Sequence, residues 1–230
     1  LDLTSPLNDA GTLRARAVLT RKDSHHFYRT AKDENTVAYG TLEADLTSST
    51  LLTIGGSYQR IRGVPLTNGL ELYPDGRDPH FSRKTAWVFP WEKSDSDTRE
   101  IFAKLAQKIG DRWNFNLNYT GLYQRNSTIY SNVAGNIMPD TGLFSAEPIS
   151  ADGSNSNNKQ FSFDSTLTGE FDVFGLPQKL TFGGNYSKEN YWMTSPDAAS
   201  MVNGWFGTTG PIMDPWHWDT SVPEPSIPAG

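Results

Sequence analysis

Aromatic and basic residues gather in one polar stretch of the sequence, between positions 63 and 97. Indole and phenol rings bind flat ligands by stacking, and Arg and Lys pair with anionic groups. The combination therefore predicts a binding site for an anionic or chromophore-bearing ligand. The alternative is that the rings merely pack this stretch against its neighbours, and the pattern leaves both interpretations open. The candidate ligand-binding residues are Tyr73, Arg83, Lys84, Trp87 and Trp91.

The histidines are not spaced as metal ligands. His25 and His26 are adjacent, so their side chains point in different directions on an extended chain. Neither His80 nor His217 has a second ligand at a suitable spacing. The sequence has no cysteine, which excludes zinc fingers, disulfide frameworks, Cys nucleophiles and iron–sulfur centres. We expect no metal site and no cofactor.

An active site is not expected either. The acidic residues Asp164, Glu170 and Asp172 could suggest an acid–base pair. They alternate with apolar residues and share their polar side with Thr and Ser, which is typical of a hydrated sheet face. Two Gly-Gly pairs, at 55–56 and 183–184, lie in strand-like segments and lack the helix that a phosphate-binding loop requires. The sequence predicts that the protein is not an enzyme.

Charge and composition narrow the class of protein further. The formal net charge is −6, which argues against nucleic acid as a partner because phosphate binding needs a basic surface. Hydrophobic residues make up 36% of the sequence, which is low for a compact soluble domain, and no apolar run is long enough for a membrane-spanning helix. Aromatic residues at 12% argue equally against disorder.

Two-residue alternation recurs in five segments of the sequence. Between Trp113 and Tyr123 the odd positions are mainly aromatic or apolar, and the even positions are mainly Asn and Thr. This period predicts a strand with one apolar and one polar face. The same alternation occurs at 13–19, 52–59, 161–173 and 180–187.

The spacing of the strands predicts a membrane barrel. Strands of roughly ten residues, with short turns at one end and long loops at the other, are typical of outer-membrane β-barrels, where lipid replaces the apolar core. We therefore expect an all-β antiparallel meander of about eight strands. The expected strands are 1–6, 12–22, 37–46, 51–62, 98–109, 112–125, 159–173 and 179–193, with long connections at 23–36, 63–97, 126–158 and 194–230.

The segment 98–109 is ambiguous. Asp97-Thr98-Arg99-Glu100 followed by spaced apolar residues reads locally as a capped amphipathic helix. The clean strand at 112–125 nevertheless needs an antiparallel partner across Gly110-Asp111. We therefore predict a strand here.

Several hairpins resemble those of TonB-dependent ferric-siderophore receptors. The likeness begins at Leu3-Thr4-Ser5-Pro6-Leu7 with the Arg14-Ala15-Arg16 strand and continues at Thr50–Tyr58. It recurs at Phe171–Gly175 with Leu180–Gly184, and at Trp216–Asp219 before Pro223-Glu224-Pro225. Neither end of the sequence resembles a natural terminus. We therefore expect residues 1–230 to be one partial β-barrel domain, without the plug domain and the remaining strands.

The resemblance implies a function and a location. Such receptors are plugged barrels of 22 strands in the Gram-negative outer membrane, so this chain would form about a third of the wall. Its partners would be a ferric siderophore, outer-membrane lipid and, through parts of the protein not in this sequence, the TonB complex. Iron would arrive wrapped in its chelator. The rival interpretations are a passive or adhesin-type barrel and a soluble β-rich glycan-binding module.

Alternation also assigns the two faces of the wall. The polar positions would face the lumen, namely Arg14, Arg16, Glu43, Asp45, Asn114, Asn116, Asp164, Thr166, Glu170 and Asp172. Strands leading into long loops end with a cation on the lipid-facing side, usually two residues after a Tyr. A cation facing lipid costs about 2–4 kcal/mol at the midplane but little at the interface. We therefore predict an outer interface belt formed by Arg21, Tyr58, Arg60, Tyr123, Arg125, Tyr186 and Lys188.

Overall fold

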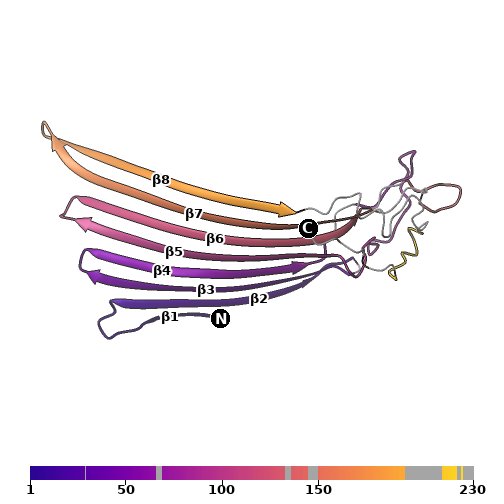
Figure 1. The fold of residues 1–230 in the computed structure, drawn as a ribbon, viewed down its shortest axis with the longest axis horizontal. Helices are drawn as coiled ribbons and strands as arrows, with labels where there is room; N and C mark the ends of the chain where they lie inside the picture. Colours follow the sequence, from indigo (N-terminus) through magenta and orange to yellow (C-terminus); the bar gives the residue numbers. More distant parts are fainter. Residues whose placement is uncertain are drawn as a thin grey trace.

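The protein folds into one eight-stranded antiparallel sheet whose strands follow one another in sequence order (Figure 1). The computed structural model describes residues 1–28, 30–65, 69–132, 136–144, 150–194, 214–221 and 224. The strands are β1 (Asp2–Pro6), β2 (Leu13–His25), β3 (Lys32–Thr47), β4 (Thr50–Gly63), β5 (Lys93–Ile109), β6 (Trp113–Asn132), β7 (Ser150–Val173) and β8 (Leu176–Thr194).

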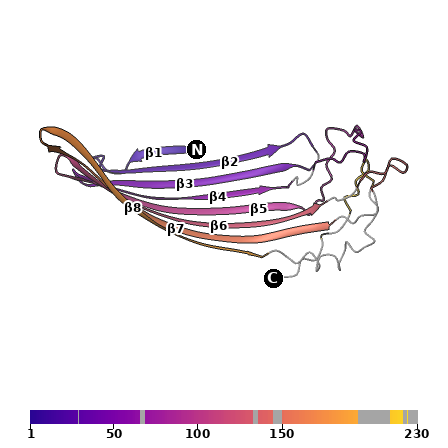
Figure 2. The same cartoon turned by 90° about the horizontal axis from the view of Figure 1, so that it is seen from above.

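The predicted all-β meander is confirmed. Each strand pairs with its sequence neighbour, and the sheet is bowed and twisted along its length (Figure 2). In the part of the chain that the structure describes there is no helix, and so none that could cross a membrane. The ambiguous segment 98–109 belongs to β5, because its backbone pairs with β4 over 98–107 and with β6 over 98–109. Pairing with two strands thus overrides its local helical pattern.

All strands except β1 are longer than the sequence predicts, and three predicted loops are correspondingly shorter. The predicted connections 23–36, 63–97 and 126–158 reduce to 26–31, 64–92 and 133–149. The additional strand residues are mainly polar on both faces, so they carry no clear alternation that could reveal them. At 24 residues, β7 greatly exceeds the roughly 9–11 residues that a strand needs to cross a membrane. The hairpins therefore extend beyond the thickness of a bilayer.

The short turns lie at the end of the sheet opposite the long loops (Figure 1). The turn between β7 and β8 contains Phe174 and Gly175, with φ angles of 53° and 78°. Positive φ at both central residues is the geometry of a type I′ turn, which suits the twist of paired strands. Within the predicted connection 194–230, Thr194 belongs to β8 and only 214–221 and 224 are otherwise described, so Pro223 and Pro225 lie outside the described residues.

Most of the buried side chains among the described residues lie in the loops, and the sheet contributes Ile129, Ser131 and Ser156 at the loop ends of β6 and β7. Trp87, Phe89, Ile137 and Phe144 form the buried apolar core, and all four come from the long connections. On the strands, large apolar side chains are exposed; Phe182 is 73% exposed and Ile101 is 59% exposed. A sheet with an open apolar face and no core of its own fits a barrel wall against lipid.

Candidate functional site

The strand register separates the sheet into two faces. Directly paired residues point to the same side, so each row across the strands belongs to one face. We call the polar face the side that carries the row Arg14, Glu43, Thr53, Lys104, Asn118, Asp164 and Asn185. The apolar face carries the row Ala15, Leu42, Ile54, Ala103, Tyr119, Phe163 and Tyr186.

Every residue predicted to face the lumen lies on the polar face. They are Arg14, Arg16, Glu43, Asp45, Asn114, Asn116, Asp164, Thr166, Glu170 and Asp172. They therefore lie on one face of the sheet, as the two-residue alternation of the sequence predicts. That this side lines a lumen remains a prediction.

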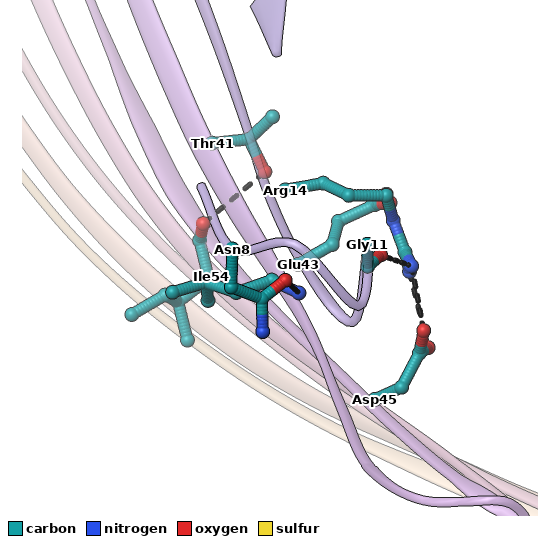
Figure 3. Close-up of polar contacts among 8 residues, drawn as sticks. Asn8, Gly11, Arg14, Thr41, Glu43, Asp45 and Ile54 are labelled. Carbon is teal, nitrogen blue, oxygen red and sulfur yellow. Dashed lines mark hydrogen bonds and ion pairs between the residues drawn. The ribbon is translucent and has the colours of Figure 1, made fainter. Parts of the chain in front are cut away.

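Arg14 organises the polar face near the first short turn (Figure 3). Its guanidinium donates to both carboxylate oxygens of Asp45, at 2.6 and 3.1 Å, and to Glu43 at 3.3 Å. A fourth bond, of 2.9 Å, reaches the Gly11 carbonyl in the turn. This fork geometry is the one in which arginine binds carboxylates most strongly. Arg14 therefore fixes the β1–β2 turn to β3.

Other charged groups of the polar face also pair between neighbouring strands. Arg16 on β2 donates to Asp2 on β1 at 2.7 Å, and Arg112, in the turn between β5 and β6, donates to Asp172 on β7 at 2.8 Å. Asn118 donates to Asp164 at 3.0 Å. The acidic residues thus form hydrogen bonds along the sheet, and within the described residues no group of three His, Cys, Asp or Glu could hold a metal ion.

The predicted belt residues lie on the apolar face, mostly in two adjacent rows. Arg21, Arg60 and Arg125 belong to a single row, joined through Thr36 on β3 and Asp97 on β5. Tyr58 and Tyr123 belong to the next row toward the short turns.

Lys188 and Tyr186 lie closer to the short turns than the other belt residues do. The β8 residue in the arginine row is Trp192, four positions along the strand from Lys188. Barrel strands are tilted by about 35–45°, so a row of paired residues does not run at one depth. The common membrane depth of the belt therefore remains a prediction.

Three belt residues, Tyr58, Arg60 and Tyr123, contact side chains on neighbouring strands. The Arg99 guanidinium lies over the Tyr58 ring at 5.9 Å, and Lys159 lies over the Tyr123 ring at 5.8 Å. The Tyr58 hydroxyl donates to Asp97 at 2.7 Å, and Asp97 also pairs with Arg60 at 3.6 Å. Asp97 was not among the predicted residues. The alternation pattern assigns apolar residues and terminal cations to the lipid-facing side, and a carboxylate there is unexpected.

The long loops meet in a cluster of aromatic side chains. We define the loop cluster as the buried residues Trp87, Phe89, Ile137 and Phe144 with the half-buried Tyr73, Phe81, Trp91 and Trp218. Rings meet edge to face at 4.8 Å for Trp87 and Phe144, and Phe89 stacks on Trp91 at 5.1 Å. The Trp87 indole N–H donates to the Pro215 carbonyl at 3.0 Å. Three connections that are distant in sequence therefore pack as one unit.

The predicted ligand-binding residues separate into two groups. Trp87 is only 6% exposed and lies inside the loop cluster, and Tyr73 and Trp91 pack against it. This placement matches the packing interpretation for Trp87. Arg83 and Lys84 are exposed beside the cluster, and Arg83 lies over the Phe27 ring at 5.2 Å. Binding of a ligand by any of these residues remains a prediction.

A buried carboxylate ties this cluster to the sheet. Glu92 is 3% exposed, and one of its oxygens accepts hydrogen bonds from the Phe89 N–H at 2.9 Å and the Ser131 hydroxyl at 2.6 Å. Burial raises the pKa of the Glu92 carboxyl above its usual value, and these hydrogen bonds oppose the rise only in part. Sequence reasoning missed Glu92, because it lies in the predicted loop 63–97, where a lone glutamate is expected to be solvated.

The comparisons with known proteins agree with this geometry. The chain is 31% identical over 201 residues to the ferric-pyoverdine M114 receptor PbuA of a Pseudomonas species. The chain is homologous to the ferric-pyoverdine receptors. The alignment covers 83% of this chain but 23% of the relative, and across such relatives the chain spans about a quarter of their length. No family model matches the chain.

Solved siderophore-receptor structures share the fold. The ferripyoverdine receptor of Pseudomonas aeruginosa matches 99% of this chain with a TM-score of 0.85 and 23% identity, using 30% of its own length. The ferric-catecholate import receptor Fiu of E. coli matches 98% of the chain with a TM-score of 0.76 and 15% identity, using 36% of its length. The likeness to siderophore receptors inferred from the sequence is therefore confirmed, and so is the barrel-wall fold.

Proposed function

We propose that residues 1–230 are a partial β-barrel domain in the wall of an outer-membrane receptor that imports a ferric siderophore of the pyoverdine type. The observation that carries this proposal is the homology to ferric-pyoverdine receptors across most of the chain. The arrangement of the sheet supports it, since an open apolar face requires lipid and the long loops gather at one end. In the intact protein, TonB would supply the energy for uptake through segments outside this chain.

Within this function, we propose separate roles for the residues of the loops. The loop cluster holds the connections in a fixed arrangement, with Trp87 as its centre. Arg83 and Lys84 stand exposed beside it and offer positive charge to an anionic chelate, while the half-buried rings of Tyr73 and Trp91 offer stacking surfaces. Iron stays within its chelator, so the protein need not ligate it.

Ligand binding by the intact receptor tests this proposal. Purified receptor is titrated with ferric pyoverdines, and binding is followed by quenching of tryptophan fluorescence. We expect saturable quenching by at least one ferric pyoverdine, together with weaker binding by a receptor carrying R83Q and K84Q. K108Q serves as the matched control, because Lys108 is an exposed cation at the short-turn end. Absence of saturable binding across a panel of ferric siderophores would reject the proposal.

A further inference from the structure

One polar atom of the loop cluster has no partner. Within the described part of the chain, the indole N–H of Trp218 is buried and makes no hydrogen bond. The Trp218 ring lies 5.0 Å from the Phe89 ring and 6.3 Å from the Trp87 ring, measured between centroids, so its neighbours are apolar. Burying a donor without an acceptor costs free energy, and such groups in native structures generally have a reason. A phenylalanine would pack in an apolar cluster without this cost.

The neighbouring indole, that of Trp87, has its polar atom satisfied by the fold. Its N–H donates to the Pro215 carbonyl at 3.0 Å. A packing role therefore accounts for the whole Trp87 side chain, including the N–H. Packing accounts for the ring of Trp218 but not for its N–H, whereas an acceptor on a bound ligand would account for both.

Two other buried side-chain atoms lack a hydrogen bond, but each belongs to a side chain with another interaction. They are Nε of Arg60 and Oδ1 of Asn158. The Arg60 Nε lies 3.6 Å from an oxygen of Asp97, and Asn158 donates through Nδ2 to Glu189 at 2.7 Å. The side chain of Trp218 has a single polar atom, so no second group can compensate for it.

Hydrogen bonds hold the segment that precedes Trp218. Asp214 accepts from the backbone N–H of Trp216 at 2.8 Å and from that of His217 at 3.2 Å. Pro215 is fully buried. Trp218 itself is half-buried, so a rotation about its side-chain bonds can bring the N–H to the surface while the backbone stays in place. A donor on a fixed backbone binds with a smaller loss of conformational entropy.

We propose that Trp218 is a further ligand-binding residue of the receptor, and that its indole N–H donates to an oxygen of the bound ferric chelate. Arg83 and Lys84 are exposed beside the same cluster and favour an anionic ligand, so a negatively charged oxygen is the acceptor that suits this donor. The ring keeps its place in the cluster, and the ligand supplies the acceptor that the apolar neighbours lack. This inference rests on the proposed function and adds one contact to it.

Calorimetric titration of the intact receptor tests this contact with W218F, which keeps an aromatic ring and removes the donor. Because a hydrogen bond to a charged acceptor is lost, W218F should bind the ferric pyoverdine that the parent binds about tenfold more weakly. Hydrogen exchange of the loop amides should increase less in W218F than in W87F, which also loses a bond of the free protein. W216F is the matched control, because it makes the same substitution in the same segment at a residue that is 41% exposed, and its affinity should equal that of the parent.

The indole proton of Trp218 separates a hydrogen bond to the ligand from an effect on packing. The receptor is labelled at the indole nitrogen of tryptophan for magnetic resonance, and the Trp218 signal is assigned by its loss in W218F. The gallium chelate of the same pyoverdine serves as a diamagnetic ligand. On binding, this proton should shift downfield and exchange more slowly with solvent, because it gains an acceptor.

Three results would overturn the inference: parent affinity in W218F, equal losses of affinity in W216F and W218F, or an unshifted Trp218 proton in the saturated gallium complex. If W218F is not obtained folded, W218Y assigns the signal and the shift in the parent receptor decides. Absence of saturable binding by the parent would instead reject the proposed function, so the two failures are distinct.

Discussion

Glu92 and Ser131 join the start of β5 to the end of β6, with the Ser131 hydroxyl donating to a carboxylate oxygen at 2.6 Å. The same oxygen accepts from the Phe89 N–H at 2.9 Å, and Phe89 is fully buried in the loop cluster. A single side chain therefore connects the aromatic cluster to the sheet.

This connection makes the stability of the loop cluster depend on pH. Burial raises the pKa of Glu92 in the folded state above its usual value of 4.5, so the folded loops bind the proton more tightly than the unfolded loops do. The stabilisation is complete below pH 4.5 and is lost as the pH rises through the raised pKa. We expect faster hydrogen exchange in 87–92 as the pH rises through this window, after correction for intrinsic exchange rates. E92Q should remove this dependence; a persistent dependence in E92Q would assign it to another group.

Trp87 should act through the structure of the loops. Removing a buried Trp side chain typically costs about 3–5 kcal/mol, so W87A should loosen the whole loop cluster. W87F keeps most of the ring packing but loses the bond to the Pro215 carbonyl, and should cost about 1 kcal/mol. Hydrogen exchange of the loop amides measures both effects. If W87A left loop exchange unchanged while abolishing ligand binding, Trp87 would be a ligand contact and not a packing residue.

Gly169 lies beneath the ring of Trp113, its direct partner across β6 and β7. A Cβ at this position would overlap the ring, so G169A should destabilise the barrel by about 1–3 kcal/mol. Gly184 on β8 offers the control, because no atom lies within 4 Å of a Cβ built there. Heat-dependent gel mobility of the intact receptor compares the two variants. Equal shifts for G169A and G184A would refute the packing of Trp113 on Gly169.

The assignment of the two faces can be tested with spin labels at adjacent positions. Thr166 lies on the polar face and Leu167 on the apolar face of β7. In the receptor reconstituted into bilayers, a label at 167 should be more accessible to oxygen dissolved in lipid. A label at 166 should be more accessible to a polar relaxation agent. Equal accessibility at the two positions would contradict the lumen and lipid assignments.

Sequence reasoning identified the strands because barrel strands repeat every two residues, as at 113–123 and 161–173. Where both faces are mainly polar, as at the loop ends of β6 and β7, the repeat is lost and the predicted strands stop too early. The sequence offered packing of the 63–97 rings only as an alternative, and it could not show which other loops they meet. Trp87, Ile137, Phe144 and Trp218 have no periodic spacing, and only the folded sheet brings their loops together.

In the proposed function, the intact receptor takes up a ferric siderophore through its barrel. The direct measurement is accumulation of radioactive iron from ferric pyoverdines by the source strain, by a deletion of the parent gene, and by the complemented deletion. We expect uptake of at least one ferric pyoverdine to be lost in the deletion, restored by complementation, and abolished when TonB is inactivated. Unchanged uptake in the deletion for every ferric siderophore supplied as the sole iron source would contradict this function.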